Sequence, residues 1–230
     1  MNLYSVYSPD RIRKAVLNSF GWMAGGLVIT GAVSAVLYSS GTFLNMLYNV
    51  PMLSLILALA QIVLTISITA GIYRMKESTM KILYVIYAAT MGISLTSLAY
   101  VYDLGTIALA FVVSAVYFLC LVAIGYTTKM DLTRIGTICI GGLIALVITQ
   151  LLLMLFHVPM MVRLMSIVGL LIFTGLTAWD IQRLPVMLEQ AEGTMMEGKL
   201  SIFMALELYL DFINIFLYIL RLLGSRSSNN

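Results

Sequence analysis

Seven apolar runs of 20 or more residues cover most of this 230-residue chain. They are residues 15–37, 51–73, 82–102, 106–126, 136–156, 161–184 and 202–223. About 20 residues of α-helix span about 30 Å, the thickness of the hydrocarbon layer of a membrane. Strands of a membrane barrel are about half as long and alternate in polarity. The sequence therefore predicts an all-α polytopic membrane protein, with seven transmembrane helices in a single domain over residues 1–230.

Composition leaves no room for a separate soluble domain. Hydrophobic residues make up 61% of the chain and charged residues only 10%, against roughly 25% charged residues in an average soluble domain. The net charge of +3 is small and the basic residues are scattered, which excludes a nucleic-acid-binding surface. The immediate partner of this chain is the lipid bilayer.

The segments between the apolar runs are polar, and two of them are long. Residues 38–49 are predicted to form a loop, and residues 185–199 form the longest polar connection. Small residues at four-residue spacing, Gly21 with Gly25 and Gly141 with Ala145, predict places where helices approach one another closely.

The distribution of Lys and Arg predicts the orientation of the chain, because cytoplasmic loops of membrane proteins carry the excess of basic residues. Three basic residues, Arg163, Arg221 and Arg226, lie on the side that holds the C-terminus. The opposite side has ten: Arg11, Arg13, Lys14, Arg74, Lys76, Lys81, Lys129, Arg134, Arg183 and Lys199. We therefore expect a cytoplasmic N-terminus. A last segment that re-enters the membrane would return the C-terminus to the same side, but residues 202–223 are long enough to cross it.

Two aspartates lie inside the apolar runs, Asp180 in the sixth and Asp211 near the middle of the seventh. A carboxylate inside a membrane is costly and normally faces a partner or a water-filled cavity, so it is a candidate functional group. At 1.5 Å per residue from the cytoplasmic end, Asp211 is about 14 Å deep and Asp180 about 6 Å deep. The two could meet if the sixth helix is tilted or displaced. Arg74 ends the second run on the same side and could compensate their charge.

The seventh run carries a polar stripe. Its members follow one another at spacings of 4, 3, 4 and 3 residues, which places them on one face of a helix. They are Glu207, Asp211, Asn214, Tyr218 and Arg221. Polar groups along the length of a membrane span cannot face lipid at low cost. The stripe therefore predicts that protein surrounds the last helix.

Two carboxyl groups at hydrogen-bonding distance cannot both ionise cheaply, so they share a proton and respond to pH. When the shared proton is lost, the two groups repel each other and attract a hard cation such as Ca²⁺. Asp180 and Asp211 are therefore candidate Ca²⁺ ligands as well as a candidate pH sensor. A buried ion pair that only fixes helix packing is the competing explanation. His157, at the end of the fifth run, is a weaker candidate for a pH sensor.

The sequence contains no familiar motif of a soluble enzyme. There is no phosphate-binding Gly-Lys-Ser/Thr loop, no His-Glu-x-x-His and no Gly-x-Ser-x-Gly. Proteolysis inside the membrane by two aspartates is the one enzymatic alternative. Proteases of that kind resemble one another in a Gly-x-Gly-Asp motif, whereas Asp180 follows Ala178-Trp179 and Asp211 follows Tyr209-Leu210. We therefore expect no enzymatic activity and no bound cofactor.

The most specific pattern is residues 205–216, Ala-Leu-Glu-Leu-Tyr-Leu-Asp-Phe-Ile-Asn-Ile-Phe, which continues to Leu-Arg-Leu-Leu-Gly at 220–224. Residues 175–182 and 125–132 are two further distinctive stretches. Together these stretches resemble the Bax inhibitor, or transmembrane BAX inhibitor motif, family, and its bacterial inner-membrane members in particular. Weaker similarity covers nearly the whole chain from about Ile12.

The resemblance implies a fold with six helices wrapped around a central C-terminal helix, in agreement with the polar stripe. It also implies a pH-sensitive Ca²⁺ leak with Asp180 and Asp211 as the sensor pair and Arg74 as the accompanying cation. Glu207 and Asn214, next to the pair on the stripe, complete the candidate ion pathway. Some relatives have an acidic residue inside the second helix, where this chain has Gln61.

A second function follows from the same resemblance, namely modulation of a membrane-bound protease. In that case the protein would be an adaptor that transports no ion. The sequence leaves the two functions open.

Overall fold

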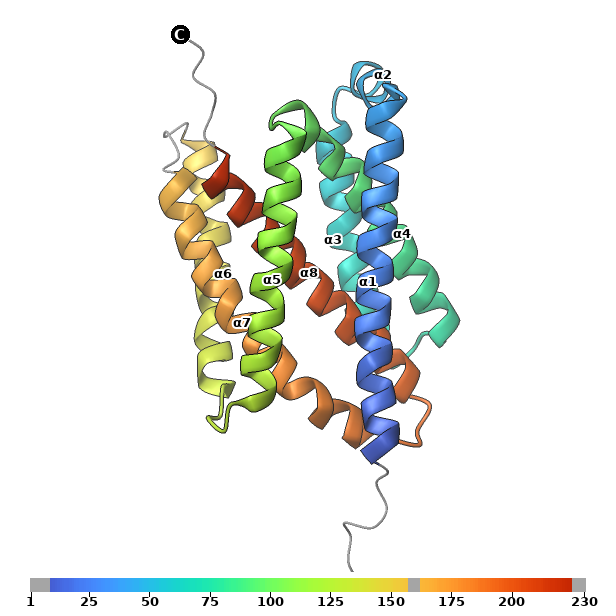
Figure 1. Cartoon of the computed structure of the whole chain (residues 1–230). Coiled ribbons are helices and arrows are strands. Elements are labelled where there is room, and N and C mark those ends of the chain that lie inside the picture. The colour runs from blue at the N-terminus through green and yellow to red at the C-terminus, as the bar shows by residue number, and fades with distance from the viewer. Residues whose placement is uncertain (1–8, 157–161, 225–230) are drawn as a thin grey trace, which may run out of the picture. The chain divides into compact units, whose positions relative to one another are not determined.

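The structure is a computed structural model that describes residues 9–156 and 162–224. Over these residues the chain forms eight α-helices, one short 3₁₀-helix and no strand (Figure 1). The elements are α1 (Pro9–Ser39), α2 (Thr42–Asn49), α3 (Leu53–Gly71), α4 (Glu77–Thr96), η2 (Ser97–Tyr100), α5 (Leu104–Thr127), α6 (Thr133–Leu155), α7 (Val162–Ala191) and α8 (Glu197–Leu223). All the α-helices except α2 are long and apolar enough to cross a membrane, which confirms the seven predicted spans.

The predicted loop at residues 38–49 is wrong, because most of it forms the short helix α2. Phe43 of α2 is buried and packs with Leu53 and Leu57 of α3. Burial of one apolar face therefore stabilises a helix where the composition alone favours a loop.

Two thirds of the predicted connection at residues 185–199 is also helical, since α7 runs through Pro185 to Ala191 and α8 begins at Glu197. A proline inside a helix removes one backbone hydrogen bond. The neighbouring side chains of Leu184 and Leu188 are almost fully buried. Their packing outweighs the effect of the proline, so tertiary contacts decide where α7 ends.

The helices form two compact units, and α7 and α8 each contribute residues to both. The first unit contains Met1–Val101 and Leu184–Tyr209. In it α4 packs against both α1 and α3. The close approach of α1 and α4 depends on Gly92, because a Cβ atom there would lie 2.7 Å from the carbonyl oxygen of Thr30.

Aromatic side chains with satisfied hydroxyl groups fill the core of the first unit. The hydroxyl of Tyr209 on α8 lies 2.6 Å from Thr30 Oγ1, which donates to the carbonyl of Ala88 at 2.9 Å. The Tyr84 hydroxyl donates to the carbonyl of Trp22 at 2.9 Å. The ring of Tyr84 meets the ring of Tyr209 edge-on, with centroids 6.0 Å apart. These contacts join α1, α4 and α8 without leaving the named hydroxyl groups unpaired.

The second unit contains Tyr102–Arg183 and Leu210–Asn230. Phe111 and Phe118 of α5 contact Phe212 of α8 edge-on, with ring centroids 5.5 and 5.7 Å apart. Glycines allow close contacts here too, since Gly125 lies against Ile181 of α7.

The predicted positions of close helix approach at Gly21, Gly25 and Gly141 are wrong. A Cβ atom added at any of these three glycines would meet no atom within 4 Å. Spacing along a helix shows that small residues share a face, but not whether another helix covers that face.

Helix α8 is the most buried of the seven membrane-crossing helices in the described part of the chain. In its most apolar stretch 72% of the residues are buried, against 44% in α7 and 11–28% in the others. This burial confirms the prediction that protein surrounds the last helix, as a central C-terminal helix requires.

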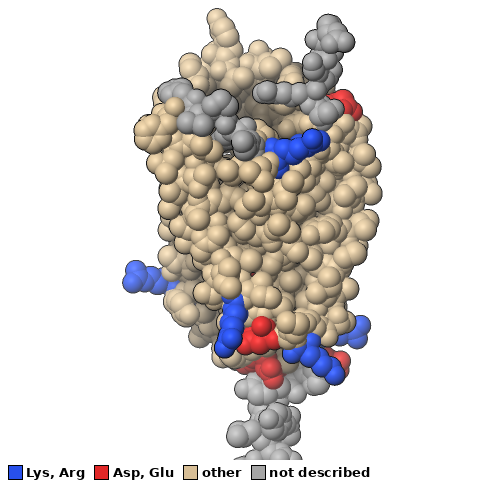
Figure 2. Space-filling model, turned by 90° about the vertical axis from the view of Figure 1, so that its left-hand side faces the viewer, with Lys and Arg blue, Asp and Glu red and all other residues tan. Residues whose placement is uncertain are grey.

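Charged side chains are unevenly distributed on the face shown in Figure 2. Lys, Arg, Asp and Glu gather toward its two ends, and a wide uncharged band lies between them. Such a band is what a hydrocarbon layer requires of a surface that contacts it.

Candidate functional site

Asp180 on α7 and Asp211 on α8 meet in the second unit, where their side chains are in hydrogen-bonding contact. They are 31 positions apart in the sequence, and both are buried, with exposed fractions of 6% and 4%. Two ionised carboxylates cannot hydrogen-bond to each other, because neither has a proton to donate. A direct hydrogen bond between Asp180 and Asp211 therefore forms only when one of the two carboxyl groups carries a proton.

The cation beside this pair is Arg183, which lies one helical turn after Asp180 on α7. Its Nε and Nη2 atoms both lie 2.8 Å from Asp180 Oδ1. The guanidinium carbon lies 4.2 Å from the centroid of the Trp179 ring, which holds the planar group in place. From the sequence, Arg183 served only to predict the orientation of the chain in the membrane. Its spacing of three residues from Asp180 was the signal for this contact, because opposite charges at that spacing on a helix commonly pair.

Arg74, the cation expected from sequence, lies in the turn after α3 in the first unit and is exposed. Its backbone N–H donates to the carbonyl of Gly71 at 2.9 Å. Compensation of the aspartate pair by Arg74 stays a prediction, whereas the contact of Arg183 with Asp180 is direct.

The other members of the polar stripe lie along α8 on either side of Asp211. Glu207 and Asn214 are half-buried, and the Asn214 amide donates to the carbonyl of Leu210 in its own helix at 2.8 Å. Tyr218 is buried, and Arg221 lies over its ring at 5.6 Å from the centroid. The stripe therefore combines buried and half-buried polar side chains along one helix.

Contacts of the two residues after Asp180 hold this part of α7 in position. Gln182 accepts a hydrogen bond from the N–H of Leu132 at 2.9 Å and donates to the carbonyl of Met130 at 2.7 Å. Ile181 packs directly against Gly125 of α5. The backbone of α7 is thus tied to α5 and to the segment before α6 within two residues of Asp180.

No group of three or more His, Cys, Asp or Glu side chains that could hold a metal ion occurs among residues 9–156 and 162–224. Ca²⁺ takes six to eight oxygen ligands, and two carboxyl groups supply at most four. The two carboxyl groups of Asp180 and Asp211 therefore do not complete a Ca²⁺ coordination shell by themselves. His157, the weaker candidate for a pH sensor, lies outside the described residues.

Comparison with known proteins identifies the family. Residues 12–228 match the sequence model of the family described as Inhibitor of apoptosis-promoting Bax1. The chain belongs to the Bax inhibitor family. This confirms the resemblance seen in the sequence.

Three bacterial relatives extend over nearly the same length. Inner membrane protein YbhL of Escherichia coli K12 is 35% identical over 209 residues, which are 90% of this chain and 89% of that protein. An uncharacterized protein of Borreliella burgdorferi is 34% identical over 217 residues, 94% of each chain. Uncharacterized protein RP147 of Rickettsia prowazekii is 33% identical over 94% of this chain and 92% of its own length. With its seven long apolar helices, this Bax inhibitor family chain is an integral membrane protein.

Proposed function

We propose that this Bax inhibitor family protein is a pH-sensitive calcium leak channel of a bacterial inner membrane, with Asp180 and Asp211 as its sensor. The observation that carries the proposal is the hydrogen-bonding contact between these two buried carboxyl groups. Because the contact needs a proton, a change of pH alters both the charge of the pair and the attraction between its members.

The pair links α7 to α8, so its protonation state acts on the packing of these two helices. With the shared proton in place, the hydrogen bond holds Asp180 against Asp211. Without it, two negative charges face each other beside the Arg183 guanidinium that pairs with Asp180. Loss of the proton therefore weakens the contact and increases the attraction for Ca²⁺, which is the transported ion.

Neighbouring polar groups extend the proposed pathway along α8. Glu207 precedes Asp211 by four residues and Asn214 follows it by three, so their side chains lie on the same stripe. The excess of Lys and Arg on one side of the helices supports a cytoplasmic N-terminus. The proposed role uses the aspartates as a titrating sensor, and it requires neither catalysis nor a resident cofactor.

Calcium flux through vesicles that contain the purified protein tests this function. We expect Ca²⁺ entry above that of protein-free vesicles, with a rate that changes between about pH 5 and pH 8. Asp131→Asn is a matched control, because hydrogen bonds from Thr133 to this exposed carboxylate hold the pKa of Asp131 below its ordinary value. Asp131 therefore stays ionised over the whole range, and its variant should retain the wild-type profile.

Absence of Ca²⁺ flux at every pH would contradict the channel proposal. The adaptor function would then be favoured, and it predicts an effect only in cells that contain the membrane-bound protease partner.

Arg183→Gln is expected to move the midpoint of the pH profile to higher pH by about 1 to 3 units. The reason is that the guanidinium stabilises the ionised form of Asp180 at 2.8 Å, so its removal lets the pair keep its proton to higher pH. The measurement is the same flux assay. Arg74→Gln is the companion variant. If it moved the midpoint of the pH profile and Arg183→Gln did not, Arg74 would be the compensating cation, in contradiction to this prediction.

A further inference from the structure

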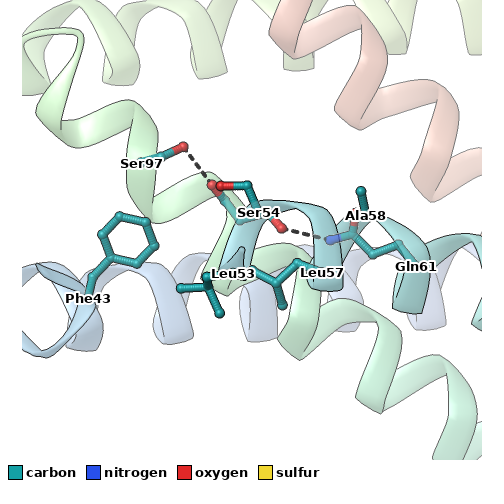
Figure 3. Close-up of a pocket in the computed structure, with 8 residues that line it drawn as sticks. Phe43, Leu53, Ser54, Leu57, Ala58, Gln61 and Ser97 are labelled. Carbon is teal, nitrogen blue, oxygen red and sulfur yellow. Dashed lines mark hydrogen bonds between the residues drawn. The ribbon is translucent and has the colours of Figure 1, made fainter. Parts of the chain in front are cut away.

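A cavity of about 280 Å³ lies in the first unit, and its lining includes neither Asp180 nor Asp211 (Figure 3). It is lined by α2, α3, the end of α4 and η2. Half of its lining residues are polar, and none is charged: Phe43, Leu53, Ser54, Leu57, Ala58, Gln61, Ser94 and Ser97. Phe43 and Gln61 lie at opposite ends of this group of side chains in Figure 3.

Hydrogen bonds connect part of the polar lining. Gln61 Nε2 donates to Ser94 Oγ at 2.9 Å, and Ser97 Oγ donates to the carbonyl of Ser94 at 2.7 Å (Figure 3). An amide has two N–H donors and an acceptor oxygen, and each hydroxyl can both donate and accept. Gln61 Nε2 also donates to Met91 Sδ at 3.9 Å. Together these hydrogen bonds use only part of the capacity of the amide and the hydroxyl groups, so the lining can also bind water.

The polar lining residues that α3 contributes, Ser54 and Gln61, belong to one face of that helix. Ser54, Ala58, Gln61 and Thr65 follow one another at spacings of 4, 3 and 4 residues. Gln61 and Thr65 contact α4, since Thr65 hydrogen-bonds to the side chain of Tyr87. The remaining faces carry large exposed apolar side chains, namely Leu55, Ile56, Leu59, Ile62, Val63 and Ile66. These apolar faces suit contact with lipid, and the polar face does not.

Gln61 lies deep in the membrane-crossing part of the chain. It is eight residues after the start of α3 at Leu53, which is about 12 Å along the helix and about 40% of a hydrocarbon layer of roughly 30 Å. A polar side chain at that depth normally faces a partner or a water-filled cavity. Ser94 Oγ and Met91 Sδ accept hydrogen bonds from the Gln61 amide nitrogen at 2.9 and 3.9 Å, and the Gln61 side chain lines the cavity.

We propose that this cavity is a water-filled vestibule, which brings water and small hydrophilic solutes from the membrane face that carries α2 to Gln61. Its volume has room for roughly nine water molecules at about 30 Å³ each, and its polar lining offers each water hydrogen-bond partners. A lipid tail in the same space would offer no hydrogen bonds to the remaining donor and acceptor capacity of the lining, which costs free energy. The lining carries no charge, so the vestibule admits solutes without binding an ion tightly.

Cysteine labelling tests the vestibule without relying on calcium flux. In a background with Cys120→Ala and Cys139→Ala, single variants Ala58→Cys and Gln61→Cys are treated with a charged, membrane-impermeant methanethiosulfonate reagent. Leu59→Cys is the matched control, because it is at the same depth as Ala58 on an apolar face and is 54% exposed. Tyr48→Cys on α2 identifies the membrane face from which the reagent enters.

We expect Ala58→Cys and Gln61→Cys to react about ten times faster than Leu59→Cys or more, because the reactive thiolate forms only where water is present. Gln61→Cys loses the hydrogen bond to Ser94, so Ala58→Cys alone decides the outcome if the other variant does not fold. Equal rates for Ala58→Cys and Leu59→Cys would overturn the proposal. Reaction of Ala58→Cys with a lipid-soluble maleimide but not with the charged reagent would also overturn it, since lipid would then fill the space.

Discussion

Replacement of Asp211 by asparagine is expected to produce a folded protein whose Ca²⁺ flux no longer changes with pH. Asparagine has nearly the size of aspartate, and its amide can donate a hydrogen bond to the carboxylate of Asp180. The contact between α7 and α8 therefore survives without a shared proton. Asp180 keeps its ion pair with Arg183 at 2.8 Å and no longer has a like charge beside it, so the pair ceases to titrate as a unit.

The measurement is Ca²⁺ flux into vesicles over a series of pH values, with circular dichroism and gel filtration as checks of folding. Asp180→Asn should flatten the profile in the same way, because a shared proton needs both carboxyl groups. Asp131→Asn, in an exposed segment before α6, should leave the profile unchanged. A folded Asp211→Asn protein with the wild-type pH profile would show that the pair only fixes helix packing.

A second large effect is expected at Gly125, where α5 contacts α7 next to Asp180. A Cβ atom at this position would lie 2.8 Å from Ile181 Cγ2 and 2.9 Å from the carbonyl oxygen of Ala178. The oxygen belongs to the backbone of α7, so the clash cannot be relieved by a side-chain rotation alone. Gly125→Ala should lower the free energy of unfolding by about 1–3 kcal/mol, and larger side chains should lower it further.

Gly141→Ala on α6 is the matched control for this substitution. No atom lies within 4 Å of a Cβ atom at Gly141, so the change adds only the helix preference of alanine over glycine, about 1 kcal/mol in favour of folding. Thermal unfolding in detergent should therefore shift in opposite directions for the two variants. Equal shifts would mean that α5 and α7 pack less closely than the contact at Gly125 requires.

The number and approximate positions of the membrane spans depend on the sequence alone. An apolar run must be long enough to cross the hydrocarbon layer, and this requirement is independent of the contacts that each helix makes. The polar stripe on residues 207–221 likewise predicts an enclosed last helix, because lipid cannot satisfy polar side chains along a whole span. Burial of α8 in the structure agrees with that argument.

Which side chains meet was decided by the tertiary structure. Depth counted along each helix places Asp180 and Asp211 in reach of each other, but helix rotation and tilt determine whether their side chains face. Helix rotation also brings Gly125, rather than Gly141, against another helix, whereas the contact of Arg183 with Asp180 follows from their three-residue spacing on α7. Tertiary packing also forms α2 and extends α7 through Pro185. Local sequence sets the length and polarity of each helix, whereas the orientation of each face depends on packing contributed by residues far away in the chain.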